Sequence, residues 1–442
     1  MDMKRKCFFT RLVCLTLFLA LIFPAFSYAQ EPIEILTLKQ TIESAIKANL
    51  DLKSSKEETA AAVAVKKARQ TNFFPTLSAS YGYDRIDAVT ETSGFIPVPK
   101  EKYEFVTSFS QPIFTGFALL RQYDIAGLGL SRAETNERLV RQDIILDAKN
   151  AYFQLLQTQK LYKVAQENVV QITSQKEVAD NFYQVGMTPL NDLLQAQVEL
   201  ANAKQDLIVA RNNMNNAESN FNTLLRRPID IPVFIEDILD YVPFEETLEY
   251  CFSEADKNRL EKKIVDLEIE IAGKELQLAK KDYYPSIDLT GSYFERGTEW
   301  DADGGEGIYD PSGWNIAAVA RWNFWEWGRT SYGVKEKRSR LAQAELRKKQ
   351  IVDDIQLEVK NSYLRTQEAE RAILAVEKAV EQAKENLRIN QEQYKEQVST
   401  QNDVLIAQTL LTRTMTNYYN SLYAFKISKA TLYRAIGQDV IE

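Results

Sequence analysis

Residues 190–225 carry the pattern that decides the fold, and they read LNDLLQAQVELANAKQDLIVARNNMNNAESNFNTLL. Large and small apolar side chains recur there at alternating spacings of three and four residues, beginning with Leu193 and Ala196 and ending with Phe221 and Leu224. A mean spacing of about 3.5 residues keeps them in one seam along a helix, and a seam sustained over four heptads is typical of left-handed coiled coils. The stretch therefore predicts a long helix that packs against another helix along its whole length.

The same register returns near the C-terminus. Its seam positions are Val404, Ala407, Leu411, Thr414, Tyr418, Ser421, Phe425, Ser428, Leu432 and Ala435, and the helix ahead of it repeats the spacing at Ala369, Ile373, Val376, Val380, Ala383 and Leu387. Shorter motifs also recur 210 or 211 residues apart: Phe74-Pro75 with Tyr284-Pro285, Lys149-Asn150-Ala151-Tyr152 with Lys360-Asn361-Ser362-Tyr363, and Asn191-Asp192 with Asn402-Asp403. A nearly constant offset over this length indicates an internal duplication.

Each copy is predicted to run helix, two strands, long helix, turn and long helix. The expected boundaries are a signal peptide at 1–29, a first repeat at 30–230 with its β-hairpin at 75–116 and its helical tip near 185–190, a linker at 231–243, and a second repeat at 244–442 with its β-hairpin at 285–328 and its tip near 397–401. As one helix, residues 118–184 would be about 100 Å long at ~1.5 Å per residue. Because this is roughly three times the hydrocarbon thickness of a bilayer, these helices are expected to project through an aqueous space.

The β-hairpin windows hold more than half of the 16 Gly and 12 Pro. Apolar and polar residues alternate there, as in Leu77 to Tyr83 and Trp314 to Trp322. In an exported chain, alternating strands with aromatic ends are typical of a transmembrane β-barrel, whereas a half-buried soluble sheet is the alternative. Trp314 and Trp322 would lie about 26 Å apart along a strand, which suits two aromatic girdles of one membrane band.

Four strands are too few to close a barrel in lipid, where an open edge leaves its hydrogen bonds unmade. Two chains would supply eight strands and three would supply twelve, and the duplication would make a trimer a six-fold ring. The fold class is therefore mainly α with membrane β. Two or three chains would together close the β-barrel, and the long coiled-coil helices would continue it as an α-barrel.

The N-terminus has the features of a secretory signal peptide. Four basic residues precede an apolar run from Leu12 to Phe26, and Ser27-Tyr28-Ala29 forms a small-x-Ala cleavage pattern. Past this segment Cys251 is the sole cysteine, so no internal disulfide is expected. The net charge of the whole chain is −8, which argues against sequence-independent nucleic-acid binding, since that binding needs basic surface.

The chain contains no histidine, which excludes Ser-His-Asp and Cys-His nucleophile pairs and histidine-ligated zinc. It also has no Gly-x-x-x-x-Gly-Lys nucleotide loop. The acidic loop at 301–307 departs from a calcium-binding loop, because Glu306 and Ser312 stand where that loop needs Gly and Glu. We therefore predict no catalytic residue, no cofactor and no metal site.

Taken in order, several motifs resemble the TolC-like outer-membrane efflux and secretion channels of Gram-negative bacteria. They are the Phe-Pro and Tyr-Pro pairs, Phe114-Thr115-Gly116 and Phe324-Trp325-Glu326-Trp327-Gly328 at the strand-to-helix returns, Ala210-Arg211-Asn212-Asn213, and the two tips, YQVGMTPLNDLL at 183–194 and YKEQVSTQNDVL at 394–405. The resemblance covers nearly the whole chain after the signal peptide. It implies a homotrimer in outer-membrane lipid, in which four strands per chain form a trimeric 12-stranded β-barrel in the outer membrane and the long helices form an α-barrel in the periplasm. It also implies a periplasmic adaptor (membrane fusion) protein and an inner-membrane pump of RND or ABC type as partners.

The implied function is a passive exit duct of a tripartite efflux or type I secretion system, and not an enzyme; a soluble periplasmic coiled-coil tether is the alternative. The resemblance places the periplasmic gate at Tyr394 and Asp403, with Tyr183 and Asp192 as their counterparts in the first copy. Three copies of Asp403 around a narrow axis would favour cations. A first-turn Asp that stabilises its own helix is the simpler interpretation.

The tips themselves are expected to contact the adaptor. The residues concerned are Val185, Gly186, Met187, Thr188, Val398, Ser399 and Thr400. Three positions depart from the family pattern, because Ile406 and Gln195 stand where a second Asp would be and Ser399 where a gating Arg would be. The resemblance therefore implies neither a double acidic ring nor an arginine lock in this chain.

Overall fold

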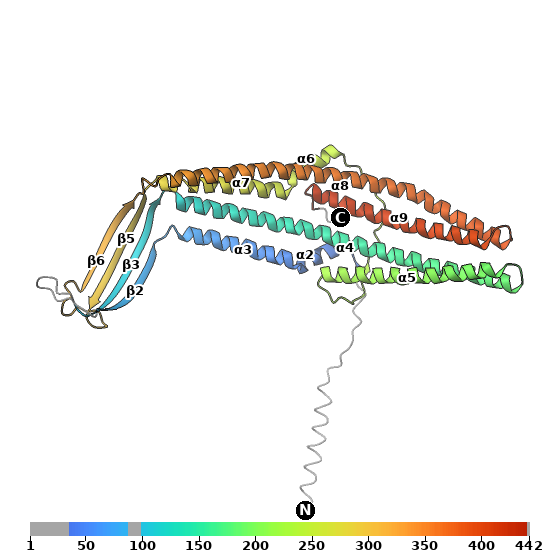
Figure 1. Ribbon diagram of the computed structural model, residues 1–442, viewed down its shortest axis with the longest axis horizontal. Helices are drawn as coiled ribbons and strands as arrows, with labels where there is room; N and C mark the ends of the chain where they lie inside the picture. The colour runs from blue at the N-terminus through green and yellow to red at the C-terminus, as the bar shows by residue number, and fades with distance from the viewer. Residues whose placement is uncertain (1–34, 87–98, 440–442) are drawn as a thin grey trace, which may run out of the picture.

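The computed structural model describes residues 35–86 and 99–439. The molecule is elongated, with a four-stranded sheet at one end and a bundle of long helices reaching to the other (Figure 1). The signal peptide predicted at residues 1–29 lies outside the described residues. Among the described residues, no helix combines the length and the apolar character that a membrane crossing requires.

Four long helices dominate the fold. They are α4 (Ala118–Gln184) and α8 (Arg329–Lys395), each of 67 residues, and α5 (Leu190–Leu224) and α9 (Gln401–Ala435), each of 35 residues. α4 returns through α5 and α8 returns through α9, so that each pair forms a helical hairpin (Figure 1). The predicted seam residues of α5 and α9 are buried or half-buried throughout. The coiled-coil prediction is confirmed.

The sheet consists of β2 (Thr76–Arg85), β3 (Glu101–Thr115), β5 (Ser286–Gly297) and β6 (Ser312–Arg321), in the order β2-β3-β5-β6. Every neighbouring pair is antiparallel. The central pairing joins the two repeats, with Thr115 opposite Ser286 and Tyr103 opposite Gly297. The four predicted strands are therefore present, and within residues 35–86 and 99–439 no strand pairs with the outer side of either edge strand, β2 or β6.

The single helix predicted ahead of each β-hairpin is wrong, because the structure has two. In the first repeat they are α2 (Leu38–Ala48) and α3 (Leu50–Thr71), and in the second α6 (Leu248–Asn258) and α7 (Leu260–Leu278). The breaks fall at Asn49 and Arg259, whose ψ angles of 134° and 120° are not helical. Asn49 begins the new helix by accepting hydrogen bonds from the backbone N–H groups of Asp51 and Leu52 at 2.7 and 3.1 Å.

Two short strands that the sequence did not predict lie near the middle of the molecule. β1 (Ile35–Leu36) pairs in parallel with β4 (Phe234–Ile235), which lies in the segment expected to be a linker. The Tyr152 hydroxyl on α4 donates to the carbonyl oxygens of Leu36 at 3.2 Å and Glu236 at 2.8 Å. Because Val233 and Leu239 are also buried, this segment packs against the helices as well as joining the repeats.

The second repeat repeats the geometry of the first almost residue for residue. Each helix before the sheet begins 210 residues after its counterpart, and each long helix begins 211 residues after its counterpart. We call residues related in this way equivalent. Within the chain, α4 of the first repeat packs against α7 and α9 of the second. Among the described residues, α8 makes no comparably extensive packing with α3 or α5 of its own chain.

Candidate functional site at the helical hairpin tips

The first tip, at residues 185–189, closes α4 with a left-handed glycine. Gly186 has φ +76°, its N–H donates to Tyr183 O at 2.9 Å, and the N–H of Met187 donates to Phe182 O at 2.8 Å. This pair of bonds is a Schellman closure, which satisfies the last carbonyls of a helix. Val185 and Met187 are left exposed at the end of the molecule.

The second tip, at residues 396–400, closes in the same way around a residue less suited to it. Gln397 has φ +63°, its N–H donates to Tyr394 O at 3.0 Å, and the N–H of Val398 donates to Gln393 O at 2.8 Å. A left-handed conformation is unfavourable for any residue that carries a Cβ. Gln397 stands where the first tip has Gly186, and the closure persists without glycine.

Asp403 lies in the first turn of α9 and completes a capping box with Thr400, the N-cap residue of this helix. Its Oδ2 accepts from the backbone N–H of Thr400 at 2.9 Å and from the Thr400 hydroxyl at 2.7 Å, while its own N–H donates to Thr400 Oγ1 at 3.2 Å. This reciprocal arrangement is a capping box. The hydrogen bonds from the Thr400 side chain and backbone hold the pKa of the Asp403 carboxyl below its usual value. The carboxylate is therefore charged and oriented by its own helix.

Tyr394 faces the first repeat. Its side chain is only 4% exposed, and its ring lies 5.5 Å from that of Phe182 on α4 in a cluster with Leu387 and Val404. Its hydroxyl has no hydrogen-bond partner among the described residues. Burial, followed by the charge of Asp192, raises the pKa of this hydroxyl. Within one chain the structure thus brings Tyr394 to Phe182 and Asp192, while Asp403 bonds to Thr400.

The remaining expected residues lie mostly on the outside. Tyr183 and Val398 are exposed, Asp192 and Thr188 are half-buried, and the Ser399 hydroxyl donates to Asn390 O at 3.3 Å. At the opposite end, the two tryptophans of the expected girdle are exposed, but only Trp314 lies within β6. Trp322 follows the last residue of that strand.

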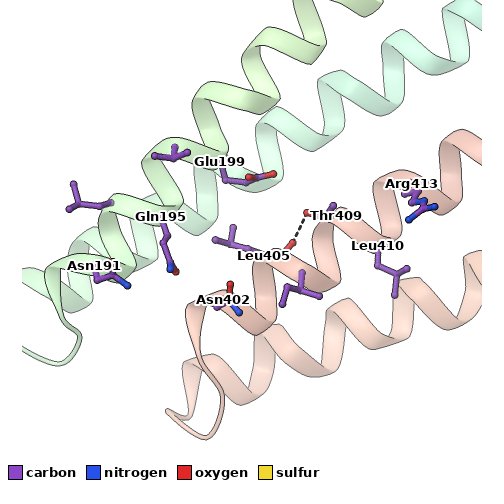
Figure 2. Close-up of a pocket in the computed structure, with 11 residues that line it drawn as sticks. Asn191, Gln195, Glu199, Asn402, Leu405, Thr409, Leu410 and Arg413 are labelled. Atoms are coloured by element: carbon purple, nitrogen blue, oxygen red, sulfur yellow. Dashed lines mark hydrogen bonds between the residues drawn. The ribbon is translucent and has the colours of Figure 1, made fainter.

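An open groove lies between the two helical hairpins, and the sequence did not predict it (Figure 2). Its volume is about 670 Å³. It is lined from α5 by Asn191, Leu194, Gln195, Val198 and Glu199 and from α9 by Asn402, Leu405, Ile406, Thr409, Leu410 and Arg413. Apolar residues outside the heptad seam, such as Leu194 and Ile406, were the signal that a second packing face exists. Figure 2 shows Asn191 and Asn402 at the tip end of the groove and Arg413 farther along α9.

The described residues contain no group of three or more Cys, Asp or Glu side chains placed to hold a metal ion. The tips and the groove present exposed apolar side chains and a few charged side chains, such as Asp403, whose orientation is held by hydrogen bonds. They lie at the end of the two long helical hairpins. The four-stranded sheet lies at the other end of the molecule, so sheet and helical tips are separated by the length of the long helices (Figure 1).

Comparison with known proteins identifies the class. A profile of the family described as "Outer membrane efflux protein" matches residues 41–225 and 252–438. The chain belongs to this family, as its motifs predict. The two matched regions correspond to the two repeats, which confirms the duplication.

Individual relatives are distant in sequence. The chain is 22% identical to the outer membrane protein TolC of Escherichia coli over 329 residues, which cover 72% of this chain and 66% of that protein, slightly less than two thirds. It is 22% identical to TolC of Vibrio cholerae over 379 residues, 83% of each. Localisation in the outer membrane, predicted from the same motifs, is confirmed.

Solved channels share the fold. The Campylobacter jejuni outer membrane channel CmeC superposes with a TM-score of 0.80 at 16% identity, over 93% of this chain and 90% of that one. The open state of the Neisseria gonorrhoeae channel MtrE gives a TM-score of 0.75 at 19% identity, over 91% and 89%. The predicted fold class is confirmed.

Proposed function

We propose that this protein is a passive exit duct, which carries substrate from an inner-membrane pump and its periplasmic adaptor through the periplasm and across the outer membrane. Three copies form the duct, with the strands as its membrane wall and the helices as its periplasmic wall. It catalyses no reaction. The energy for transport comes from the pump, of RND or ABC type, since the chain has no nucleotide loop.

The observation that carries this proposal is an exposure difference between equivalent faces of α4 and α8. On α4, which packs against α7 and α9 of the second repeat, Thr135 and Phe153 are 3% and 5% exposed. Their equivalents on α8, Leu346 and Leu364, are 63% and 47% exposed. Leucine side chains thus lie in the open on α8 at positions whose equivalents on α4 are buried, and another copy of the chain is the surface that fits them.

The sheet supports the same conclusion. β3 pairs with β5 where the repeats meet, so the equivalent pairing joins β6 of one copy to β2 of the next. β3 extends to Thr115, whereas β6 ends at Arg321, five residues short of the equivalent position. Residues 322–326 have no strand partner within the described chain, and β2 of a second copy would supply it. Three copies give twelve strands, which is enough to close a barrel.

At the tips, we propose that Tyr394 and Asp403 form the periplasmic gate, aided by Tyr183 and Asp192. The hydroxyl of Tyr394 is buried without a partner and lies near Asp192. Because an unsatisfied buried hydroxyl costs about 1–3 kcal/mol, a closed arrangement that gives it a partner would be favoured. The exposed residues Val185, Met187 and Val398 are the proposed adaptor contacts.

The test is conductance of purified protein in planar bilayers. We expect discrete steps from the wild type, and an inert bilayer combined with water-soluble monomers would overturn the duct. Replacing Asp403 by Ala and Tyr394 by Phe together is expected to raise basal conductance. Asp403→Glu is the matched control, since it keeps both the charge and the capping box. Unchanged conductance in the double variant would remove these residues from the gate.

A further inference from the structure

The joint between the two repeats of one chain is held by a cluster of charges near the middle of the molecule. Arg434 at the end of α9 contacts Asp143 on α4 at 2.8 Å and Glu261 on α7 at 2.8 Å. Arg259, only 5% exposed in its side chain, contacts Glu261 and Glu358 at 2.8 Å each. We call these five residues the internal clasp, because they tie α4 of the first repeat to α7, α8 and α9 of the second.

The equivalent positions form the joint between copies, and there both arginines are missing. Asn49 takes the place of Arg259, and Thr223 takes that of Arg434. The acidic positions are kept, as Asp51, Asp147 and, on the partner subunit, Asp354. Burial and then the charges of Asp143 and Asp51 raise the pKa of the Asp147 carboxyl. This direction agrees with an acidic cluster that has no arginine in the places of Arg259 and Arg434.

Two arginines lie one turn farther along, directly after α5. The N–H groups of Arg226 and Arg227 donate to Thr223 O at 3.1 Å and Asn222 O at 2.9 Å, so both residues are fixed in the closure of the helix. Arg226 has φ +57° and is the equivalent of Gly437, φ +75°. Within residues 35–86 and 99–439, neither arginine side chain forms an ion pair, and neither do Asp353 and Asp354.

A second contact of the internal joint identifies the residue of the partner subunit that would lie beside Arg226. Gln142 on α4 donates from Nε2 to Gly437 O at 3.4 Å. Its equivalent on α8 is Asp353, and the equivalent of Gly437 is Arg226. The same geometry at the joint between copies therefore places Asp353 of the partner subunit beside Arg226, and Asp354 of the partner subunit beside Thr223.

We propose, resting on the trimer of the proposed function, that Arg226 and Arg227 bind Asp353 and Asp354 of the partner subunit and form an external clasp. The internal clasp takes its arginines from the start of α7 and the last turn of α9. The external clasp takes its arginines from the turn after α5. Its arginines are less buried than Arg259, so its ion pairs are more strongly screened by salt. The three joints between copies are thus the salt-sensitive joints of the ring.

A charge-reversal experiment on the full-length trimer in detergent tests this clasp. Arg226→Asp with Arg227→Asp places four carboxylates together, and we expect the trimer-to-monomer ratio on native mass spectrometry to fall at least about tenfold at low salt. Adding Asp353→Arg with Asp354→Arg restores opposite charges with the wild-type composition, and the ratio should recover. A reversal variant as trimeric as the wild type, or a swap that fails to recover, overturns the clasp. A monomeric wild type would instead overturn the proposed trimer.

Crosslinking tests the register independently of stability. Thr223→Cys with Asp354→Cys, treated with a short bismaleimide, should give covalently linked dimers and trimers. The matched control is Thr223→Cys with Asn361→Cys, one heptad or about 10 Å away along α8, which should link poorly. Cys251 does not compete, because it is buried and burial raises its pKa to about 11. Equal linking by both pairs would overturn the register.

Discussion

Replacing Gln397 by Gly should stabilise the second tip, because this residue holds a left-handed backbone at φ +63°. Gly186 provides the internal reference, since it makes the same closure at φ +76° with open space where a Cβ would lie. Both tips make the same two closing hydrogen bonds, so we attribute the difference in stability between the two closures to the side chain at this position.

The expected magnitude follows from two opposing effects. A left-handed conformation costs about 1–2 kcal/mol for a residue with a Cβ, and glycine avoids this cost. Glycine in turn loses about 0.5–1 kcal/mol more conformational entropy on folding. The net stabilisation of the tip is therefore about 0.5–1 kcal/mol, which corresponds to a twofold to fivefold change in the local opening equilibrium.

Hydrogen exchange on the assembled protein measures this directly. The amides of Gln397 and Val398 donate the two closing bonds, and their protection should rise by that twofold to fivefold factor in Gln397→Gly. In the reciprocal variant Gly186→Gln, protection of the backbone amides at positions 186 and 187 should fall. Unchanged or reduced protection at positions 397 and 398 in Gln397→Gly would refute the strain argument. If Gln397→Gly raised protection equally at the first tip, the effect would not be local.

Three further outcomes are expected. Tyr152→Phe removes the donor to Leu36 O and Glu236 O and should lower the free energy of unfolding by about 1–3 kcal/mol in urea titrations followed by near-ultraviolet circular dichroism, whereas Tyr183→Phe should change it by less than about 0.5 kcal/mol. Cys251, with its pKa raised to about 11, should react with a thiol reagent at pH 8 at least about a hundredfold more slowly in the folded than in the unfolded protein, and a similar rate would contradict its burial. The lowered pKa of Asp403 makes its capping box fully stabilising above about pH 4 and progressively lost as the pH falls through the folded value. Protection factors for hydrogen exchange at the start of α9, which are corrected for the intrinsic exchange rate at each pH, should therefore fall in acid in the wild type and show no such dependence in Asp403→Asn.

The tips show how far sequence reasoning reaches at the candidate site. Asp403 was identified by its spacing from Tyr394 and by the family resemblance, and its capping box with Thr400 follows from a local three-residue pattern. That Tyr394 would turn its ring to Phe182 on the other repeat was not predictable, because the contact depends on how the two hairpins lie against each other. The groove between α5 and α9 was missed for the same reason.

The helix breaks illustrate a second limit. Asn49 is a residue that favours the start of a helix, so its break had a weak local signal. Arg259 has none, and its position is held by long-range bonds to Glu358 and to Ala435 O. The short pairing of β1 with β4 likewise depends on Tyr152 reaching two distant backbone carbonyls.

The sequence by itself determined the heptad helices, the two β-hairpins, the positions of the tips and the duplication, because each depends on a local period or a fixed offset along the chain. Only the tertiary structure decided which faces of the repeats meet and which stay open. Equivalent residues carry the same local pattern, yet Phe153 is buried and Leu364 is exposed. The physical reason is that burial is a property of two surfaces, and in the proposed trimer the surface that covers Leu364 lies on the next copy.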